Sequence, residues 1–333
     1  MEAPASGSIE LNGRTVAEQI GAQIFIDGWA IVAASDPALA ARLAEQAARV
    51  SHDGVAVDAA KLWAAMEAEA FASRDIQHVI DVGLRQIAPS SPVACLVADV
   101  RDWRMRYADW RDARKEIERR YGYDKYAGNC HVVPNHALMI MAALYAPDNF
   151  SLAQTIVCTS GWDTDCNAGN VGCLMGAMLG LEGLEAGKDW RGPLADRMLI
   201  SSADGGFAIN DAVRVSERLV SLGRRLAGLP PIDAPKRGAR ESAVALAERA
   251  ARIVVRIQTQ RLDLDAVDVE RLRGPRADGE AGSLRRAGRG ASSNRAAHRP
   301  QASRAACGGA DQRRPARSAA TRHRCSAPTA DRN

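Results

Sequence analysis

The chain has 333 residues, of which 47% are apolar and 5% aromatic, and its formal net charge is +4. This composition supports a sizeable core in one large or two modest domains, and abundant Ala and Leu with few aromatic residues favour helices over sheets. The apolar runs are much shorter than the roughly 20 residues of a membrane span, and the N-terminus lacks the basic and apolar regions of a signal peptide. The seven cysteines include no Cys-x-x-Cys pair, which is typical of reduced thiols and argues against a disulfide framework. We therefore expect an all-α, cytoplasmic protein that does not enter a membrane.

The first part of the chain predicts a succession of helices. Residues 1–14 are expected to form a flexible leader, and Asp27-Gly28 is expected to be a turn. Asp36 can cap the next helix, and Pro37 suits the first helical position. Apolar periodicity predicts the helices over residues 37–50, 57–71, 75–87 and 93–120, the last as one long helix with a charged outer face.

An irregular, aromatic-rich stretch covers residues 121–136 and precedes a helix over 137–145. Its tyrosine rings could stack on an adenine or a ribose. Cys130, His131 and His136 could suggest zinc, but no second ligand pair has matching spacing, so we do not expect a zinc site there. A helix over 151–158 follows.

Two carboxylates, Asp163 and Asp165, stand two residues apart directly before an apolar, glycine-spaced run over 171–180. The simplest geometry is a loop that turns into a central buried helix over 167–181, with both carboxylates at its N-terminus. Glycines at three- and four-residue spacing predict that another backbone packs very close to one face of this helix. Buried carboxylates are costly unless paired, and Mg²⁺ or Mn²⁺ is one partner that offsets the cost. The alternative is that one of the two is an ordinary helix N-cap.

The motif Gly-x-Asp-Thr-Asp at 161–165, followed by Asn-Ala and a Gly/Ala-rich helix, resembles the C-terminal metal motif of the ADP-ribosylglycohydrolases. The resemblance covers about residues 15–228 and is most specific over 161–180. It implies a compact multi-helix orthogonal bundle that hydrolyses the glycosidic bond of ADP-ribosyl groups at a two-metal site, usually magnesium, with manganese as the alternative. By the same resemblance, Asp163 and Asp165 match metal-binding aspartates, and Cys166 stands where the family usually places a Thr or Ser ligand.

Further site residues follow from the same resemblance. His52 lies in a loop that resembles one beside the bound ribose, although a histidine at a helix junction can equally contact the carbonyl end of a helix. Tyr126 and His131 belong to a stretch that resembles the loop closing the substrate pocket. The N-terminal half-site of the family is a Thr-Asp-Asp run, and no such run occurs in this sequence, so the resemblance implies that this half-site is missing.

Composition changes sharply near the end of the chain. We expect a helical domain over 15–235, a helical extension over 236–273 and a disordered tail over 274–333. The tail holds thirteen Arg, no Lys and four acids, so its net charge is +9 and the rest of the chain carries about −5. Such a tail can bind nucleic acid electrostatically, or it is a spurious extension of the kind that GC-rich sequence yields out of frame.

Two functions stay open at this point. The first is a hydrolase that cleaves an N- or O-glycosidic bond of an ADP-ribosylated protein or a small ADP-ribose conjugate, using a magnesium centre. The second is a catalytically inactive ADP-ribose-binding protein, or a vestigial one, that lacks the N-terminal metal half-site. Nucleic-acid binding is not expected outside the Arg-rich tail, because the charged helix faces mix both signs.

Overall fold

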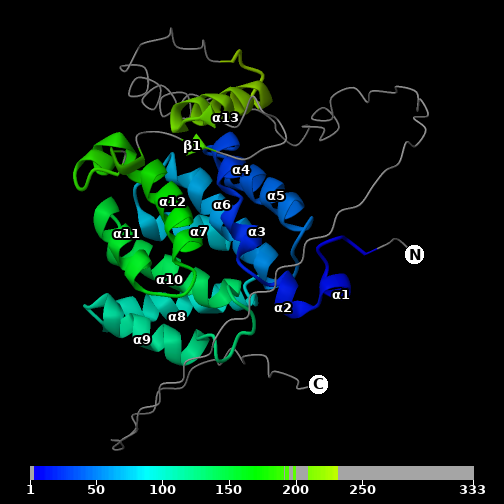
Figure 1. Cartoon of the computed structure of the whole chain (residues 1–333), viewed down its shortest axis with the longest axis vertical. Coiled ribbons are helices and arrows are strands. Elements are labelled where there is room, and N and C mark those ends of the chain that lie inside the picture. The colour runs from blue at the N-terminus through cyan, green and yellow to red at the C-terminus, as the bar shows by residue number, and fades with distance from the viewer. Residues whose placement is uncertain (1–3, 191, 195–197, 200–208, 232–333) are drawn as a thin grey trace, which may run out of the picture. The chain divides into compact units, whose positions relative to one another are not determined.

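The structure is a computed structural model that describes residues 4–190, 192–194, 198–199 and 209–231 (Figure 1). These residues are almost wholly helical, which confirms the predicted all-α class. In chain order the elements are α1 (Ile9–Asn12), α2 (Arg14–Ala17), α3 (Gly21–Ile24), α4 (Asp27–Val32), α5 (Pro37–Ala48), α6 (Val55–Ala70), α7 (Ile76–Leu84), α8 (Pro92–Arg106), α9 (Trp110–Tyr121), α10 (Val132–Tyr145), α11 (Phe150–Thr159), α12 (Thr164–Glu185), the 3-10 turn η1 (Gly192–Leu194), β1 (Met198–Leu199), β2 (Ile209–Asn210) and α13 (Ala212–Leu226). The two short strands pair antiparallel. Across these described residues, no helix combines the length and hydropathy that a membrane span requires.

Polar side chains set where many of these helices begin. Asp36 accepts a hydrogen bond from the Leu39 N–H at 2.9 Å, as the sequence predicts, and so satisfies one of the unpaired amides of the first turn. Side chains of the same kind start α7, α8, α9 and α11, namely those of Asp75, Ser91, Asp109 and Asn149. Local sequence therefore fixes these boundaries before any tertiary contact forms.

The two most completely buried helices are α6 and α10, and they form the centre of the described body. Helix α6 packs against α5 through alanines on both helices, which allows the two axes to approach closely. Helix α7 also packs against α6, and a Cβ atom on Gly83 of α7 would lie only 2.8 Å from the Leu62 carbonyl oxygen of α6. Glycine is therefore required at position 83 for α7 to lie this close to α6.

Helix α12 differs from its predicted form. It packs on α11, α10, α6 and α3 (Figure 1), but only one of its faces is buried, so it is not the central helix. The predicted close backbone contact at its glycines is wrong: Gly169 faces the Ile24 side chain, Gly172 faces the Gln154 side chain, and nothing lies within 4 Å of a Cβ atom built on Gly176. Gly180 interrupts the helix with φ 68° and ψ −169°, which a glycine adopts readily.

Three further predictions need correction. The helix expected over 93–120 is two helices, α8 and α9, because Tyr107 is extended and the Asp109 side chain caps a new start. Asp27 is not in a turn but is the first residue of α4. The expected flexible leader includes α1, where the Ile9 N–H donates to the Asp53 carboxylate at 3.2 Å.

The sequence also predicts an amphipathic helix over 210–226, and the structure has it as α13. It begins at Ala212 because Asn210 lies in β2 and Asp211 caps the helix. Helix α13 packs on α4, where any side chain on Gly223 would collide with the Val32 carbonyl group. The extension expected over 236–273 and the tail expected over 274–333 lie outside the described residues, as does the turn that the sequence Asp204-Gly205-Gly206 predicts.

Candidate active site

A sharp turn joins α11 to α12 and presents the two aspartates. Gly161 and Trp162 both have positive φ, 84° and 61°, and the Thr164 N–H donates to the Trp162 carbonyl oxygen at 3.1 Å. This conformation suits glycine but is strained for tryptophan. The Trp162 ring has two close neighbours: it stacks on Tyr123 with centroids 5.2 Å apart and planes 9° apart, and the Arg114 guanidinium lies 4.1 Å from its centroid. These contacts stabilise a strained backbone next to Asp163.

Asp163 occupies the N-cap position of α12, yet its side chain accepts no capping hydrogen bond. The alternative of an ordinary N-cap therefore does not describe this residue, because its carboxylate makes no hydrogen bond to the backbone amides of the first helical turn. Ligand atoms of Asp163, Asp165 and Cys166 all lie within 4.8 Å of one another. The structure thus brings together the three residues that the sequence predicts as metal ligands.

The electrostatics of these three groups differ from one another. Burial raises the pKa of Asp163, against an opposing hydrogen bond from the Cys166 thiol. A hydrogen bond from Asp163 lowers the pKa of the exposed Asp165, which stays ionised at neutral pH. Burial, followed by the hydrogen bond to Asp163, raises the pKa of Cys166 to about 12. The thiol is therefore protonated at neutral pH and is a poor ligand for a hard cation.

Asn135 on α10 organises this turn, and sequence reasoning missed it. Its Oδ1 accepts from the Asp163 N–H at 3.2 Å and from Asn167 Nδ2 at 2.9 Å, and its Nδ2 donates to the Tyr123 hydroxyl at 2.7 Å. Asn135 and Asn167 are both fully buried, and Asn167 Oδ1 has no hydrogen-bond partner. The signal that was available is a lone amide on an otherwise apolar helix, since a buried amide needs partners.

The three predicted substrate residues lie around the segment 18–21. His131 caps α10 with its Nδ1 and places its Nε2 3.4 Å from Glu18 Oε2. The Tyr126 ring lies 4.8 Å from the His131 ring. His52 packs over Gly21 and bonds Ser51 Oγ at 2.7 Å, and burial lowers its pKa.

Among the described residues, no contact joins these three side chains directly to Asp163 or Asp165. The ring of His52 meets Ser51 rather than a helix carbonyl group, so the structure does not support the helix-end alternative for it. Cys130, from the same loop as Tyr126, does come close: the charges of Asp163 and Asp165 contribute to the raised pKa of its thiol, after burial.

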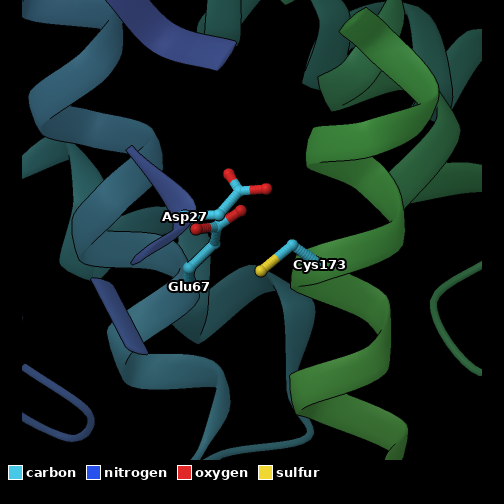
Figure 2. Close-up of side chains that lie close together, drawn as sticks. All are labelled: Asp27, Glu67 and Cys173. Atoms are coloured by element: carbon cyan, nitrogen blue, oxygen red, sulfur yellow. The ribbon is translucent and has the colours of Figure 1, made fainter. Parts of the chain in front are cut away.

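Asp27, Glu67 and Cys173 form a second cluster, which was not predicted from the sequence (Figure 2). These residues come from α4, α6 and α12, and Glu67 is completely buried. Nothing in the local sequence pairs them, because the three lie in separate segments.

These observations define a protein of the all-α class with paired carboxylates at the N-terminus of α12. A family model described as ADP-ribosylglycohydrolase matches residues 3–226, and the chain therefore belongs to the ADP-ribosylglycohydrolase family. Membership supports a hydrolase of ADP-ribosyl groups. Neither the curated proteins nor the solved structures contain a significant match.

Proposed function

We propose that this protein cleaves an N- or O-glycosidic bond of an ADP-ribosyl group with a magnesium ion held by Asp163 and Asp165. The observation that carries the proposal is the uncapped Asp163 carboxylate, which lies beside Asp165 at the start of α12. Two carboxylates suit a hard cation, whereas the protonated Cys166 thiol does not, so the described donor set fits magnesium with two protein oxygens here.

The chain's own residues have separable tasks in this proposal. Asn135 accepts a hydrogen bond from the Asp163 N–H and so orients the turn that carries both carboxylates. Asp165 is exposed, and a hydrogen bond from Asp163 lowers its pKa, so it offers an ionised oxygen to a cation at the start of α12. When bound, magnesium would orient the ribose hydroxyls and lower the pKa of an attacking water.

The experiment is a hydrolysis assay in magnesium with ADP-ribosyl-arginine, ADP-ribosyl-serine and small ADP-ribose conjugates. We expect Asp163→Asn to lower turnover by at least about a hundredfold, because metal-assisted charge stabilisation contributes several kcal/mol. Asp75→Asn is the matched control: it makes the same change at an exposed cap, where asparagine keeps the hydrogen bond, so turnover should not change. Turnover that survives Asp163→Asn would remove these carboxylates from the mechanism.

A second function, ADP-ribose binding without hydrolysis, is favoured by one observation. The Cys166 thiol is protonated and donates to Asp163, so it occupies a carboxylate oxygen that a metal would otherwise use. Calorimetry with ADP-ribose, with and without magnesium, separates the two functions. Metal-independent binding without turnover supports the binding protein, and metal-dependent turnover supports the hydrolase.

A further inference from the structure

The cluster of Asp27, Glu67 and Cys173 is the strongest feature that the proposed function leaves unused. One oxygen of each carboxyl group and the Cys173 sulfur all lie within 4.8 Å of one another. Figure 2 shows the two carboxyl groups side by side, with the Cys173 sulfur pointing toward Glu67. Cys173 lies eight residues beyond Asp165, which is about 12 Å along a helix, so this cluster is separate from the one at the start of α12.

In the described part of the chain, the carboxyl groups of the cluster have no positively charged side chain beside them to balance their charge. Glu67 is 0% exposed, and its Oε1 accepts from Trp63 Nε1 at 3.0 Å. Its Oε2 has no hydrogen-bond partner outside the cluster, and besides Trp63 the residue hydrogen-bonds with Asp27 and Cys173. Asp27 accepts from Asn170 Nδ2 at 2.7 Å. Within the described residues no Lys, Arg or His forms an ion pair with Asp27 or Glu67. Burying carboxylates without a counter-charge is costly, so something must lie between them.

A proton or a cation can fill this position. Burial, and then the charge of Asp27, raises the pKa of Glu67 well above its usual value, and burial raises the pKa of Asp27 to about 6. Burial likewise raises the pKa of the Cys173 thiol. Metal ligands bind in their deprotonated form, so a cation at this position would compete with protons for the same oxygens and sulfur.

We propose that Asp27, Glu67 and Cys173 bind a zinc ion. Two carboxylate oxygens and a thiolate suit a borderline-soft cation, whereas the sulfur disfavours magnesium and calcium. Three protein ligands leave the fourth tetrahedral position for water. Asp27 and Cys173 are partly exposed, so zinc can enter from their side and meet Glu67 at the base.

Neighbouring side chains already orient two of the ligands. Asn170 donates to Asp27 and Trp63 donates to Glu67, as outer partners of a metal site commonly do. Zinc would join α4, α6 and α12, three helices from distant parts of the chain. Because the site exists only in the folded protein, zinc binding should raise the stability of the fold.

The first measurement is thermal unfolding of the full chain, stripped with a chelator and titrated with zinc. We expect the midpoint to rise by about 5 °C when zinc exceeds its dissociation constant a hundredfold. Glu67→Gln keeps the size and the Trp63 hydrogen bond, so it should fold without metal, but its zinc affinity should fall at least about tenfold. Cys173→Ser is a second variant with the same expected loss.

The second measurement identifies the sulfur. Cobalt in place of zinc gives a sulfur-to-cobalt charge-transfer absorption when a thiolate is a ligand. This absorption should disappear in Cys173→Ser and persist in Cys166→Ser, the matched control at the other cluster. If the absorption and the zinc-induced shift are unchanged in Cys173→Ser and Glu67→Gln, or if the shift is absent in the unaltered chain, the cluster holds only protons and the proposal is wrong.

Discussion

The part of the chain that the structure describes contains two similar clusters, each with two carboxyl groups and one cysteine. Asp163, Asp165 and Cys166 lie together at the start of one helix, whereas Asp27, Glu67 and Cys173 come from three helices. In the first cluster the pKa of exposed Asp165 is lowered, and in the second the pKa of buried Glu67 is raised. Burial also raises the pKa of Asp163, and a hydrogen bond from Asp163 lowers that of Asp165, so similar donor sets differ in protonation through burial and hydrogen bonding together.

The largest expected effect is on the free energy of unfolding, which should respond differently to substitutions in the two clusters. In chelator, Glu67→Ala should lower the free energy of unfolding by about 3 kcal/mol, because it opens a cavity and leaves the Trp63 N–H without a partner. Asp165→Ala should change it by less than about 1 kcal/mol, since the residue is exposed. Denaturant unfolding measures both. Equal effects would show that the clusters do not differ in burial as described.

An intermediate effect concerns His136, which lies in the polar network between the clusters. Its Nδ1 donates to Gln23 Oε1 at 2.8 Å, and Gln23 in turn donates to Asn170, the partner of Asp27. Burial lowers the pKa of His136 to about 3, so the folded protein keeps the ring neutral while the unfolded chain protonates below about pH 6.5.

At these pH values the folded state binds fewer protons than the unfolded chain. The free energy of unfolding therefore falls as the pH is lowered through 6.5 toward 3. Between pH 7 and pH 5 the loss from this group is about 2 kcal/mol. His136→Gln keeps a donor for Gln23 and should lose about 2 kcal/mol less over that interval in denaturant unfolding. Parallel pH profiles for the two proteins would contradict a neutral, buried imidazole.

The smallest expected effect tests position 166 alone. Cys166→Thr replaces a protonated thiol with a hydroxyl oxygen and releases the Asp163 carboxylate from its hydrogen bond. Magnesium affinity should rise by about 1 kcal/mol, or roughly fivefold, in a metal titration at neutral pH. Cys173→Thr in the same titration should leave magnesium affinity unchanged. If Cys166→Thr binds magnesium no more tightly than the unaltered chain, position 166 does not reach the metal.

Local signals were sufficient for most of the fold. The cap Asp36 and the apolar periodicity predicted where several helices begin. The break between α8 and α9 was missed, because Asp109 as a cap competes with a helical pattern that continues through it. The close contact expected at Gly172 was wrong, because spacing alone cannot tell whether a backbone or a side chain fills the space beside a glycine.

The same distinction holds for the two clusters. Asp163 and Asp165 are two residues apart, so their proximity can be predicted from the local sequence. Glu67 and Glu69 look alike there, yet Glu69 bonds His78 at the surface and Glu67 is fully buried. The available signal was that Glu67 follows Trp63 by one helical turn on the same face. The proximity of Glu67 to Asp27 depends on how three helices pack, which no local sequence pattern predicts.

The contacts of the Trp162 ring with Arg114 and Tyr123 have an optical consequence. The indole directly precedes Asp163 in the chain, and its phenol neighbour is hydrogen-bonded through Asn135 to that same turn. Any shift of the turn must slide the indole against a cation and an aromatic ring, which alters its emission. Of the six tryptophans, Trp162 is thus an intrinsic fluorescent reporter of the geometry at the start of α12.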